Sequence, residues 1–328
     1  MSPPPNIAVI GAGQLGSRHL QALAKLDRAA HVYVIDPVPA SLERAGERFA
    51  EVARDGTRVE LSLADELRAL PPVLDVVIVA TNADHRAAVV RELLGHSRVQ
   101  SVVLEKVLFQ RDAEYAEIAD RFAATSTNAW VNCPRRMWAG YQSLRDELRG
   151  QGPLAYRVQG AGWGLACNGI HFIDHAAFLT ERHDLHITSA DLQAGVAPSR
   201  RPGYVEFLGT VNGEFGDGSR IQLSCPSESV EPITLEITTS ARQYTIREGL
   251  SNIGWTSITE PENAGTIPLE PLYQSQLSHL VVQDLLEQGD CPLTPYAESA
   301  RLHRPLLDAF LTHYRTHVAP GAETCPIT

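Results

Sequence analysis

The sequence predicts an α/β N-terminal domain with a doubly wound parallel sheet, followed by an α+β domain with a mostly antiparallel, open-faced sheet. Up to residue 134, apolar runs without polar alternation are separated by helical patterns, which is typical of parallel strands covered on both faces. The first of these runs ends in a Gly-rich turn. After residue 134, strand-like runs follow one another without intervening helices, as in antiparallel sheets. We therefore expect domains over residues 1–134 and 135–328, and the C-terminal helices can pack back on the first domain.

The first element, residues 6–16, reads NIAVIGAGQLG and joins a β-prone run to a Gly-x-Gly-x-x-Gly turn. In such a turn the first glycine makes the tight bend, the second lets the backbone approach a pyrophosphate, and the third lets the new helix pack on the strand. The first amides of that helix then face the anion. The residues expected to contact the cofactor here are Gly11, Gly13, Gln14, Leu15 and Gly16.

The second strand, residues 31–35, ends in Asp36, which lies 20 positions beyond Gly16. A carboxylate at this spacing accepts hydrogen bonds from an adenosine ribose. A structural glycine turn followed by a surface aspartate would give the same letters, but the helical spacing of Leu20 and Leu23 favours a dinucleotide. Asp36 would repel a 2′-phosphate, and only Arg44 is near enough in sequence to offset it, so we expect NAD rather than NADP.

The rest of the first domain alternates helices and strands. Ser41 can cap a helix with an apolar face. We expect strands over residues 59–63, 75–81, 101–106 and 129–132, and helices ending at residue 70 and over residues 85–94 and 112–124. Ligands of such sheets bind at the carboxyl ends of the strands, where Thr81, Asn82, Glu105 and Lys106 fall.

The second domain is expected to contain five strands. They cover residues 156–159, 204–211, 220–223, 233–239 and 244–247. Helices are expected over residues 137–149, 169–179, 273–287 and 297–314, and residues 198–202 are expected to form a loop.

Composition limits the function classes. The chain has 328 residues, of which 44% are hydrophobic and 20% charged, as in ordinary globular proteins. Its net charge of −11 argues against a nucleic-acid partner, because a polyanion would be repelled. No apolar run approaches membrane-spanning length, so no membrane association is expected.

The start of the chain and its cysteines indicate a cytoplasmic protein. The first residues, MSPPPN, include neither a charged leader nor an apolar core. The five cysteines are widely spaced and form no CxxC pair, so reduced thiols in a cytoplasm are the simplest account. His171 with His175, and His183 with His186, resemble metal-ligand spacings, but no further cluster converges with them, and we expect no metal site.

Five motifs in this order resemble the glucose–fructose oxidoreductase/inositol dehydrogenase/rhizopine-catabolism (Gfo/Idh/MocA) oxidoreductase family. They are the Gly-rich turn with its acid, then TNADH, LEKV, NCPRR and CNGIHFID, and together they span nearly the whole chain. The resemblance implies a Rossmann domain that binds NAD or NADP, paired with an open-faced sheet domain. It also implies oxidation or reduction of carbinol carbons in sugars, inositols or nucleotide sugars, and a homodimer or homotetramer formed through the outer sheet face.

The resemblance assigns roles to single residues. Lys106 matches the lysine beside the substrate and the nicotinamide, and His171 matches the histidine that is usually the acid/base. Asp174 matches the acid three positions later, on the same helix face as His171 by spacing. His85 matches the histidine that opens the helix after the fourth strand, and Arg136 the arginine that commonly follows the sixth. We therefore expect Lys106, His171 and Asp174 to be catalytic.

Two positions depart from the family pattern. Val107 replaces the proline of Glu-Lys-Pro, whose peptide bond is often cis. A cis bond before a residue other than proline costs about 2.5–4 kcal/mol, so we expect the backbone that aims Lys106 to differ. Cys167 replaces an aspartate, which leaves a Lys/His pair with Asn168 as a hydrogen-bonding substitute.

Hydride transfer from an alcohol needs a group that takes the hydroxyl proton and a positive group near the developing alkoxide. His171 can take the proton at neutral pH, and Lys106 can stabilise the oxygen. In isolation, each would read as an ordinary strand-end lysine or core histidine. For the substrate, the candidate binding residues are Arg136, Trp163 and Asn168, and the neighbouring Arg135 and Trp138 could also pair, stack or simply pack.

Three function classes remain open. The first is an NAD-dependent oxidoreductase of a sugar, inositol or nucleotide sugar. The second is a glycosidase that uses tightly bound NAD for transient oxidation. The third is a non-catalytic dinucleotide-binding regulator, against which the presence of both Lys106 and His171 argues.

Overall fold

The computed structural model describes residues 3–53, 57–228, 232–247 and 250–328, so the first two residues of the MSPPPN segment lie outside it. The chain divides into two compact units. Unit 1 consists of Met1–Phe109, Ala113–Asn132 and Leu272–Tyr296. Unit 2 consists of Gln110–Asp112, Cys133–Pro271 and Ala297–Thr328. The predicted pairing of a parallel sheet with a mostly antiparallel sheet is confirmed.

Unit 1 is a doubly wound sheet of seven strands in the order β17-β6-β5-β4-β1-β2-β3. Its strands are β1 (Asn6–Ile10), β2 (Ala30–Ile35), β3 (Val59–Ala64), β4 (Val73–Val79), β5 (Arg98–Leu104), β6 (Asn128–Val131) and β17 (Thr294–Pro295). All neighbours pair in parallel except β17, which is antiparallel to β6. The central strands are apolar and buried on both faces, as their sequences predicted.

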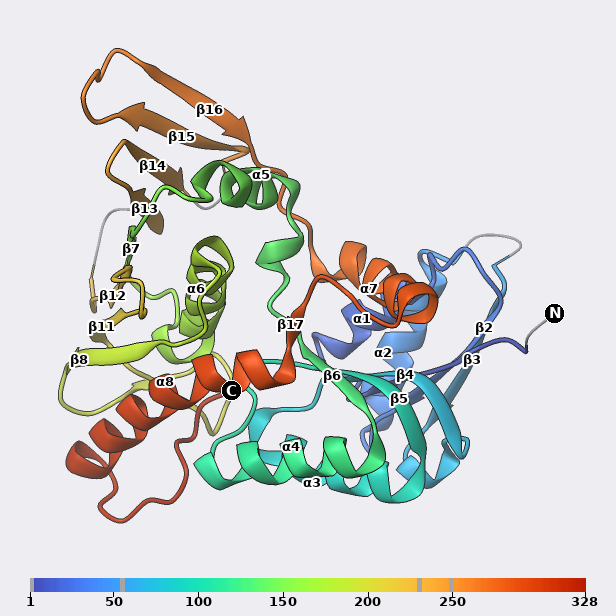
Figure 1. Cartoon of the computed structure of the whole chain (residues 1–328). Helices are drawn as coiled ribbons and strands as arrows, with labels where there is room; N and C mark the ends of the chain where they lie inside the picture. Colours follow the sequence, from blue (N-terminus) through green and yellow to red (C-terminus); the bar gives the residue numbers. More distant parts are fainter. Residues whose placement is uncertain (1–2, 54–56, 229–231, 248–249) are drawn as a thin grey trace. The chain divides into compact units, whose positions relative to one another are not determined.

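Helices cover both faces of this sheet. The helices are α1 (Gly16–Leu23), α2 (Pro39–Ala50), the 3₁₀ turn η1 (Leu67–Ala69), α3 (Ala83–His96), α4 (Asp112–Thr125) and α7 (Gln274–Gln288). Helices α1, α2 and α7 lie on one face, and α3 and α4 on the other (Figure 1). Helix α7 comes from far along the chain and packs beside α1. Two segments that are distant in sequence therefore meet on the face of the sheet next to the Gly-rich turn.

Three local predictions in unit 1 are wrong. Helix α2 begins at Pro39 rather than after a Ser41 cap, because proline has the backbone angle of a first helical turn and needs no amide hydrogen bond there. Strand β5 ends at Leu104, so Glu105 and Lys106 follow the strand instead of closing it. The Lys106–Val107 peptide bond is cis, contrary to the expectation from the substitution of proline by Val107.

Unit 2 is built on an eight-stranded sheet in the order β16-β15-β14-β13-β7-β12-β11-β8. Its strands are β7 (Ala155–Gln159), β8 (His186–Leu192), β11 (Gly209–Glu214), β12 (Arg220–Cys225), β13 (Thr234–Thr238), β14 (Arg242–Arg247), β15 (Asn252–Ser257) and β16 (Ala264–Pro268). Only β7 and β12 pair in parallel among these described strands. Alternate residues such as Tyr156 and Val158 are buried, which leaves the other face of the sheet polar.

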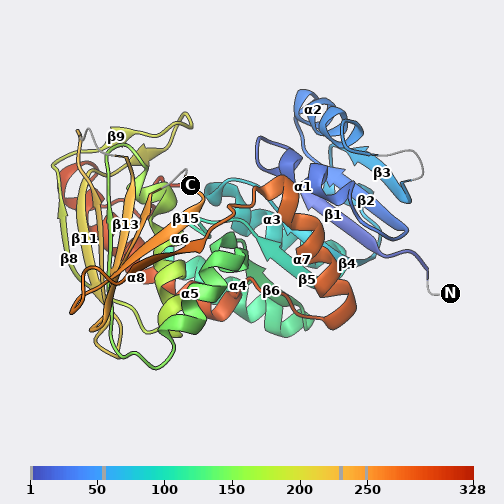
Figure 2. The ribbon, with the colours of Figure 1, turned by 90° about the horizontal axis from the view of Figure 1, so that it is seen from above.

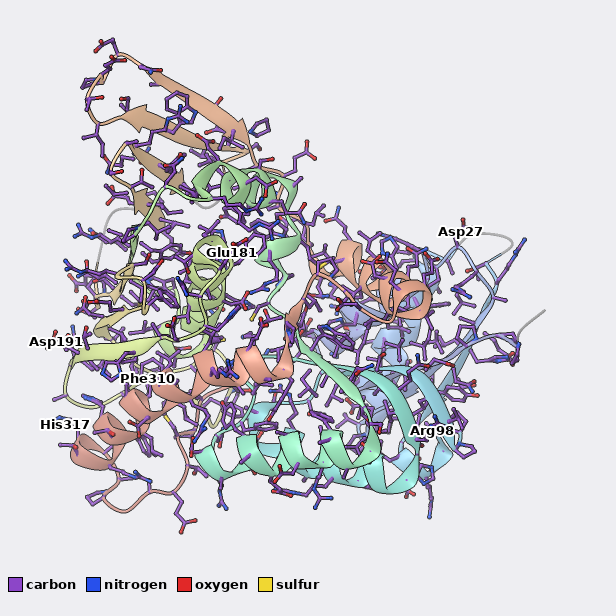
Figure 3. All side chains as sticks on the ribbon, in the orientation of Figure 1. Asp27, Arg98, Glu181, Asp191, Phe310 and His317 are labelled. Carbon is purple, nitrogen blue, oxygen red and sulfur yellow. The ribbon has the colours of Figure 1, made fainter. Side chains whose placement is uncertain are left out.

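The remaining elements of unit 2 are helical except for a two-stranded ribbon. They are the 3₁₀ turn η2 (Pro134–Met137), α5 (Ala139–Leu148), α6 (Leu165–Thr180), β9 (Ala197–Pro198), β10 (Val205–Glu206) and α8 (Tyr296–His317). Helix α6 packs on one face of the sheet (Figure 2). Phe310 of α8 (Figure 3) stacks on Phe207, with ring centroids 4.7 Å apart. Residues 198–202, expected to be a loop, begin in β9, because the backbone of Pro198 pairs with Val205.

No helix in the described ranges has both the length and the apolar composition needed to cross a membrane.

Candidate active site

The Gly-rich turn needs two of its glycines for the fold itself. Gly11 has a φ of +94°, and a Cβ atom there would lie 3.0 Å from the carbonyl carbon of Ala80 at the end of β4. A Cβ atom on Gly16 would lie 1.7 Å from the carbonyl oxygen of Gly11. Any side chain would therefore block the tight bend or the contact between helix and turn.

Gly13 is different, because its surroundings are open. A Cβ atom built there meets no heavy atom within 4 Å, and its φ lies outside the glycine-favouring region. The protein's own packing therefore does not explain this glycine, whereas close approach of a ligand does. Nearby, the Thr81 hydroxyl oxygen is buried and has no hydrogen-bond partner in the described part of the chain. An open glycine and an unsatisfied hydroxyl at one sheet edge fit a polar ligand such as a dinucleotide.

Asp36 lies at the end of β2 and is only 9% exposed. Its Oδ2 accepts a hydrogen bond from the Ala12 amide at 2.6 Å, and its Oδ1 accepts one from the Val38 amide at 2.9 Å. The carboxylate thus joins the Gly-rich turn to the start of α2. Each oxygen keeps a second lone pair, so Asp36 can still accept hydrogen bonds from ribose hydroxyls.

Arg48 of α2 is a residue of this region that the sequence did not indicate. Its guanidinium group donates to the Gln14 backbone oxygen at 3.3 Å, to Gln14 Oε1 at 3.1 Å and to the Ser17 hydroxyl. Burial, and then the positive charges of Arg18 and Arg44, lower the pKa of Arg48. Arg48 therefore places a positive charge at the Gly-rich turn, with Arg18 and Arg44 near enough to lower its pKa.

Arg86 of α3 fixes the segment after Lys106. It is buried, and its guanidinium group donates to the Leu108 carbonyl at 2.9 Å and to the carbonyls of Val107 and Thr81. These contacts hold the ends of β4 and β5 together behind Lys106, which is 9% exposed. The sequence did not indicate Arg86, because its burial and its partners become visible only in the structure.

The other predicted residues of unit 1 lie at this edge with different exposures. Asn82 occupies the N-cap position of α3. His85 is exposed, with Nε2 3.3 Å from a carboxylate oxygen of Asp84. Glu105 is 2% exposed, and burial alone would raise its pKa. Hydrogen bonds from His19 and Asn132 and the positive charge of Lys106 outweigh burial, so the pKa of Glu105 is below its usual value.

Unit 2 contains a pocket of about 300 Å³ that includes three of the predicted residues, His171, Trp163 and Asn168. The pocket is lined by Pro134, Arg135, Trp138, Trp163, Asn168, His171, Phe172 and Ile233. The Asn168 side-chain amide donates to the Trp163 carbonyl at 2.6 Å, and the Arg135 guanidinium lies 4.2 Å from the centre of the Phe172 ring. One wall therefore presents a titratable imidazole, an amide, a cation and indole rings.

A carboxylate that the sequence did not indicate lies at the start of the helix that carries His171. Glu206 of β10 accepts hydrogen bonds from the Ala166 amide at 2.8 Å and the Cys167 amide at 3.3 Å. Gly164, with a φ of +80°, makes room, because a Cβ atom there would lie 3.1 Å from Glu206 Oε1. Glu206 thus caps α6 from another element. In the sequence, the only indication of such a cap was a glycine before a helix that lacks a capping side chain of its own.

Asp174 and Arg136 bind each other. Asp174 is fully buried, and its two oxygens accept hydrogen bonds from Arg136 at 3.0 and 3.1 Å. This bidentate pair joins η2 to α6, which both contribute residues to the pocket, although neither Arg136 nor Asp174 lines it. The pair therefore fixes the two elements that carry Arg135 and His171.

His175 is explained by internal hydrogen bonding. Its Nδ1 lies 2.9 Å from the Tyr156 hydroxyl, and burial, followed by the charges of Arg135 and Arg136, lowers its pKa well below the usual value. His175 is therefore neutral at physiological pH. In the described ranges, no group of three or more His, Cys, Asp or Glu side chains is arranged to hold a metal ion.

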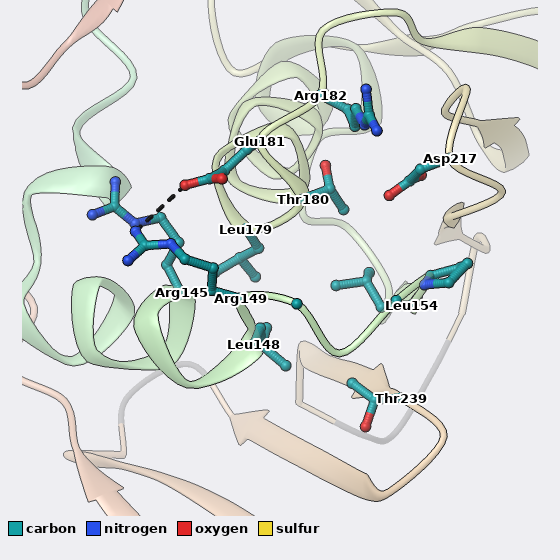
Figure 4. A pocket seen from close by; sticks show the side chains of 13 residues that line it. Arg145, Leu148, Arg149, Leu154, Leu179, Thr180, Glu181, Arg182, Asp217 and Thr239 are labelled. Atoms are coloured by element: carbon teal, nitrogen blue, oxygen red, sulfur yellow. Dashed lines mark hydrogen bonds and ion pairs between the residues drawn. The ribbon is translucent and has the colours of Figure 1, made fainter.

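A second pocket of unit 2, of about 260 Å³, contains none of the predicted residues (Figure 4). It lies where α5 and α6 end, and Arg149 contacts Glu181 there at 3.5 Å. Arginines at helix C-termini complement the partial negative charge of the last carbonyls. This arrangement accounts for the charges without a ligand.

Comparison with a family model supports the reading of unit 1. Residues 5–133 match the family described as "Oxidoreductase family, NAD-binding Rossmann fold", which is the Gfo/Idh/MocA family. The match confirms the recognition made from the sequence motifs over residues 5–133, most of which lie in unit 1. A comparison with curated proteins found no match.

Solved structures extend the likeness in fold to almost the whole chain. An oxidoreductase from Agrobacterium radiobacter in complex with NAD⁺, L-tartaric acid and magnesium is similar with a TM-score of 0.71 and 15% identity, covering 96% of this chain and 97% of that one. UDP-N-acetylglucosamine 3-dehydrogenase from Acidithiobacillus ferrooxidans gives 0.69 and 16%, covering 97% and 98%. A putative NADPH-dependent oxidoreductase from Desulfitobacterium hafniense gives 0.70 and 15%, covering 94% and 95%.

Substitution of Gly13 by alanine should separate ligand binding from folding. The added methyl group meets no protein atom within 4 Å, so Tm should change little, whereas a pyrophosphate that approaches the backbone would collide with it. Gly13→Ala should therefore weaken NAD binding in calorimetry by at least about tenfold. Gly16→Ala is the matched control, and it should lower Tm. Unchanged NAD affinity in a folded Gly13→Ala protein would contradict this placement of the cofactor.

Acid sensitivity should depend in part on His175. Its folded pKa lies below the unfolded value of about 6.5, so below that pH the unfolded chain binds a proton that the folded chain does not. As the pH falls below about 6.5, the free energy of unfolding should decrease by up to about 1.4 kcal/mol per pH unit, until the pH reaches the pKa of His175 in the folded protein. Urea unfolding of His175→Gln should lack this component between pH 6.5 and 5.5. Substitution of the exposed His85 by glutamine should leave this pH dependence unchanged. If the free energy of unfolding varies with pH equally in His175→Gln and in the native protein, His175 is not its source.

Proposed function

Because residues 5–133 belong to the oxidoreductase family with an NAD-binding Rossmann fold, we propose that the chain is an NAD-dependent dehydrogenase or reductase acting on CH–OH groups. The hydride passes between the nicotinamide and a carbinol or keto carbon of a sugar, inositol or nucleotide sugar. The observation that carries this proposal is the pocket of unit 2, where His171 lies with Asn168, Trp163 and Arg135. That set of side chains combines a proton acceptor with groups that bind hydroxyls and flat or anionic substituents.

The chain's own residues divide the work. Gly11, Gly13 and Gly16 with Asp36 hold the dinucleotide, which when bound accepts or donates the hydride. Gln14, Leu15, Thr81, Asn82 and His85 complete this cofactor group. An imidazole nitrogen of His171 takes the hydroxyl proton, and the Lys106 ammonium group stabilises the negative charge that develops on the oxygen.

Asp174 and Arg136 act together in this scheme. Their buried bidentate pair keeps η2 against α6, so that Arg135 and His171 line the same pocket. Glu206 holds the first turn of the same helix, next to Cys167, where the family pattern has an aspartate. The pocket is thus shaped by two carboxylates that do not line it.

The substrate class follows from the pocket lining. The Asn168 amide and the His171 imidazole can bind hydroxyl groups, indole rings pack on sugar rings or bases, and Arg135 can pair with an anionic group. Two of the fold neighbours, a UDP-N-acetylglucosamine 3-dehydrogenase and an oxidoreductase in complex with L-tartaric acid, are consistent with a polyhydroxylated substrate.

We further propose a cytoplasmic homodimer or homotetramer. The outer face of the sheet in unit 2 is polar, and its side chains are linked in rows. Asn212 donates to the Ser189 hydroxyl at 2.9 Å and accepts from Gln222 at 3.0 Å. Such an ordered polar surface suits a flat, hydrated interface between copies.

A substrate screen tests the function. Free sugars, inositols and nucleotide sugars are incubated with the protein and NAD, NADH is followed by absorbance, and products are identified by mass spectrometry. Net NADH with an oxidised product supports the dehydrogenase. Bond cleavage without net NADH, with NAD retained through purification, indicates the glycosidase, and binding of NAD without any product indicates a regulator.

Lys106 and His171 should affect turnover more than cofactor affinity. Neither belongs to the Gly-rich turn, and the Asp36 carboxylate accepts from the Ala12 and Val38 amides, so NAD binding in calorimetry should persist in both variants. His171→Asn should lower kcat by about 10²–10⁴, the usual share of general acid/base catalysis, and Lys106→Ala should also lose turnover. Lys25→Ala is a matched lysine control that should keep full activity. Near-normal kcat in either active-site variant would exclude its assigned role.

The protein should prefer NAD to NADP. The Asp36 carboxylate would lie against a 2′-phosphate, and like charges repel. Steady-state kinetics should therefore give a higher kcat/KM with NAD, and Asp36→Ala should narrow the difference, whereas the exposed Asp27→Ala should not. Equal or better kcat/KM with NADP would instead mean that the nearby Arg44 and Arg48 dominate.

A further inference from the structure

Five polar side chains of unit 1 are joined in a closed circuit of contacts. His19 of α1 is 1% exposed, with Nε2 2.9 Å from Glu105 Oε1 and Nδ1 2.8 Å from the Ser278 hydroxyl of α7. The Ser278 oxygen lies 2.8 Å from Gln274 Nε2, and Gln274 Oε1 lies 2.8 Å from Asn132 Nδ2. Asn132 Nδ2 also contacts Glu105 Oε1. The contacts therefore return to the carboxylate from which they start.

The ionised carboxylate fixes the direction of these hydrogen bonds. The pKa of Glu105 is below its usual value, so at neutral pH its oxygens can only accept. Asn132 must then face Glu105 with its amide nitrogen. Because the same nitrogen reaches Gln274, that side chain must present its oxygen to Asn132. The Gln274 nitrogen is thereby directed to Ser278 and to His19 Nδ1, which is 3.3 Å away.

The same reasoning assigns the proton of the buried histidine. The Glu105 carboxylate can only accept, so Nε2 of His19 carries a proton and donates to it. Nδ1 of His19 lies 2.8 Å from the Ser278 hydroxyl and 3.3 Å from the Gln274 amide nitrogen. The Ser278 oxygen accepts from that amide nitrogen and also lies 3.3 Å from the Gln274 carbonyl oxygen. Each member of the circuit then has a partner of the correct kind.

We propose that this circuit, which we call the Glu105 ring (His19, Glu105, Asn132, Gln274 and Ser278), holds the Glu105 side chain just after β5 and thereby positions the adjacent Lys106. His19 and Ser278 are positioning residues in this assignment. On the other side of Lys106, Arg86 holds the carbonyls of Val107 and Leu108, so the lysine lies between two fixed segments. The catalytic consequence rests on the proposed function, whereas the ring itself does not.

Helix α7 gains a role from this assignment. The chain leaves unit 1 at Asn132 and returns at Leu272 to form α7, and two of the five ring members lie on its first turns. The α7 residues provide the polar partners that orient His19. Substitution of Gln274 or Ser278 should therefore change the surroundings of Lys106, although both residues lie more than 160 positions away in sequence.

Nitrogen NMR of ¹⁵N-histidine tests the proton assignment in the full chain. The His19 signal, identified by its loss in His19→Gln, should show a proton on Nε2 at neutral pH. An Nε2 without a proton would overturn the ring, because His19 could then not donate to the Glu105 carboxylate. The measurement needs no substrate and no turnover.

Lysine NMR tests the positioning claim, because the chain has only two lysines, Lys25 and Lys106. Ser278→Ala opens the ring, so it should shift the ¹³Cε signal of Lys106 and the Nδ1 signal of His19, and Ser278→Thr should restore both. Lys25 is an internal control, since its ammonium group donates to the Ser275 carbonyl of the same helix at 2.9 Å. If the Lys25 signal also shifts, α7 as a whole has been displaced, and the shift of Lys106 is then not an effect of the ring. An unchanged Lys106 signal also overturns the proposal.

Kinetics then connect the ring to the reaction. Ser278→Ala should lower kcat about tenfold, the effect of one lost hydrogen bond, with an unchanged Kd for NAD, and Ser275→Ala should change neither. Normal kcat in Ser278→Ala, with a shifted Lys106 signal, would refute the catalytic consequence. Absence of hydride transfer in the native protein would refute the proposed function instead, and the two NMR measurements would still decide the ring.

Discussion

The burial of the Glu105 charge is the constraint on which the structure of unit 1 depends. A carboxylate that is 2% exposed is strongly disfavoured as an ion unless hydrogen bonds and a positive charge replace water. Here His19, Asn132 and Lys106 supply that replacement. The partners come from α1, the end of β6 and the residue after β5, and α7 orients them. A single charge thus requires four separate segments to meet at one edge of the sheet.

The same edge carries the features that suit a dinucleotide. Gly11 and Gly16 are required by the bend and by helix packing, whereas Gly13 leaves open space. Asp36 is held by two backbone amides and so presents its carboxylate in a fixed orientation. Unit 2 is organised in a similar way. The helix that carries His171 is fixed by the ion pair of Asp174 with Arg136 and by the cap that Glu206 supplies. In both units, buried charges position groups that are themselves more accessible.

Much of this organisation could be predicted from the sequence. The parallel sheet was predictable because its strands are uninterrupted apolar runs, and the turn because its three glycines have a defined spacing. His171 and Asn168 were predicted from the motif resemblance and Trp163 from its capacity to stack on a substrate, and all three line one pocket. Strands β8, β15 and β16 were missed because their sequences are largely polar or small, as expected at or next to the edges of a sheet with one solvated face.

The side chains that the sequence did not indicate share a physical reason. His19, Arg48, Arg86 and Glu206 act through partners that are distant in the chain, and no local period records such contacts. Their signal is burial of a polar group, which becomes visible only once the elements are packed. Asp174 illustrates the converse, since its helical spacing from His171 suggested a shared face, whereas its carboxylate pairs with Arg136.

The central claim, that a buried and ionised Glu105 organises this edge, is tested most directly by carboxyl ¹³C NMR of the native protein. The ¹³Cδ signal of Glu105, identified by its loss in Glu105→Gln, should be that of a carboxylate at neutral pH. On acidification it should stay so below the pH at which exposed glutamates titrate, about 4.3. A protonated carboxylic acid signal at neutral pH would contradict the account.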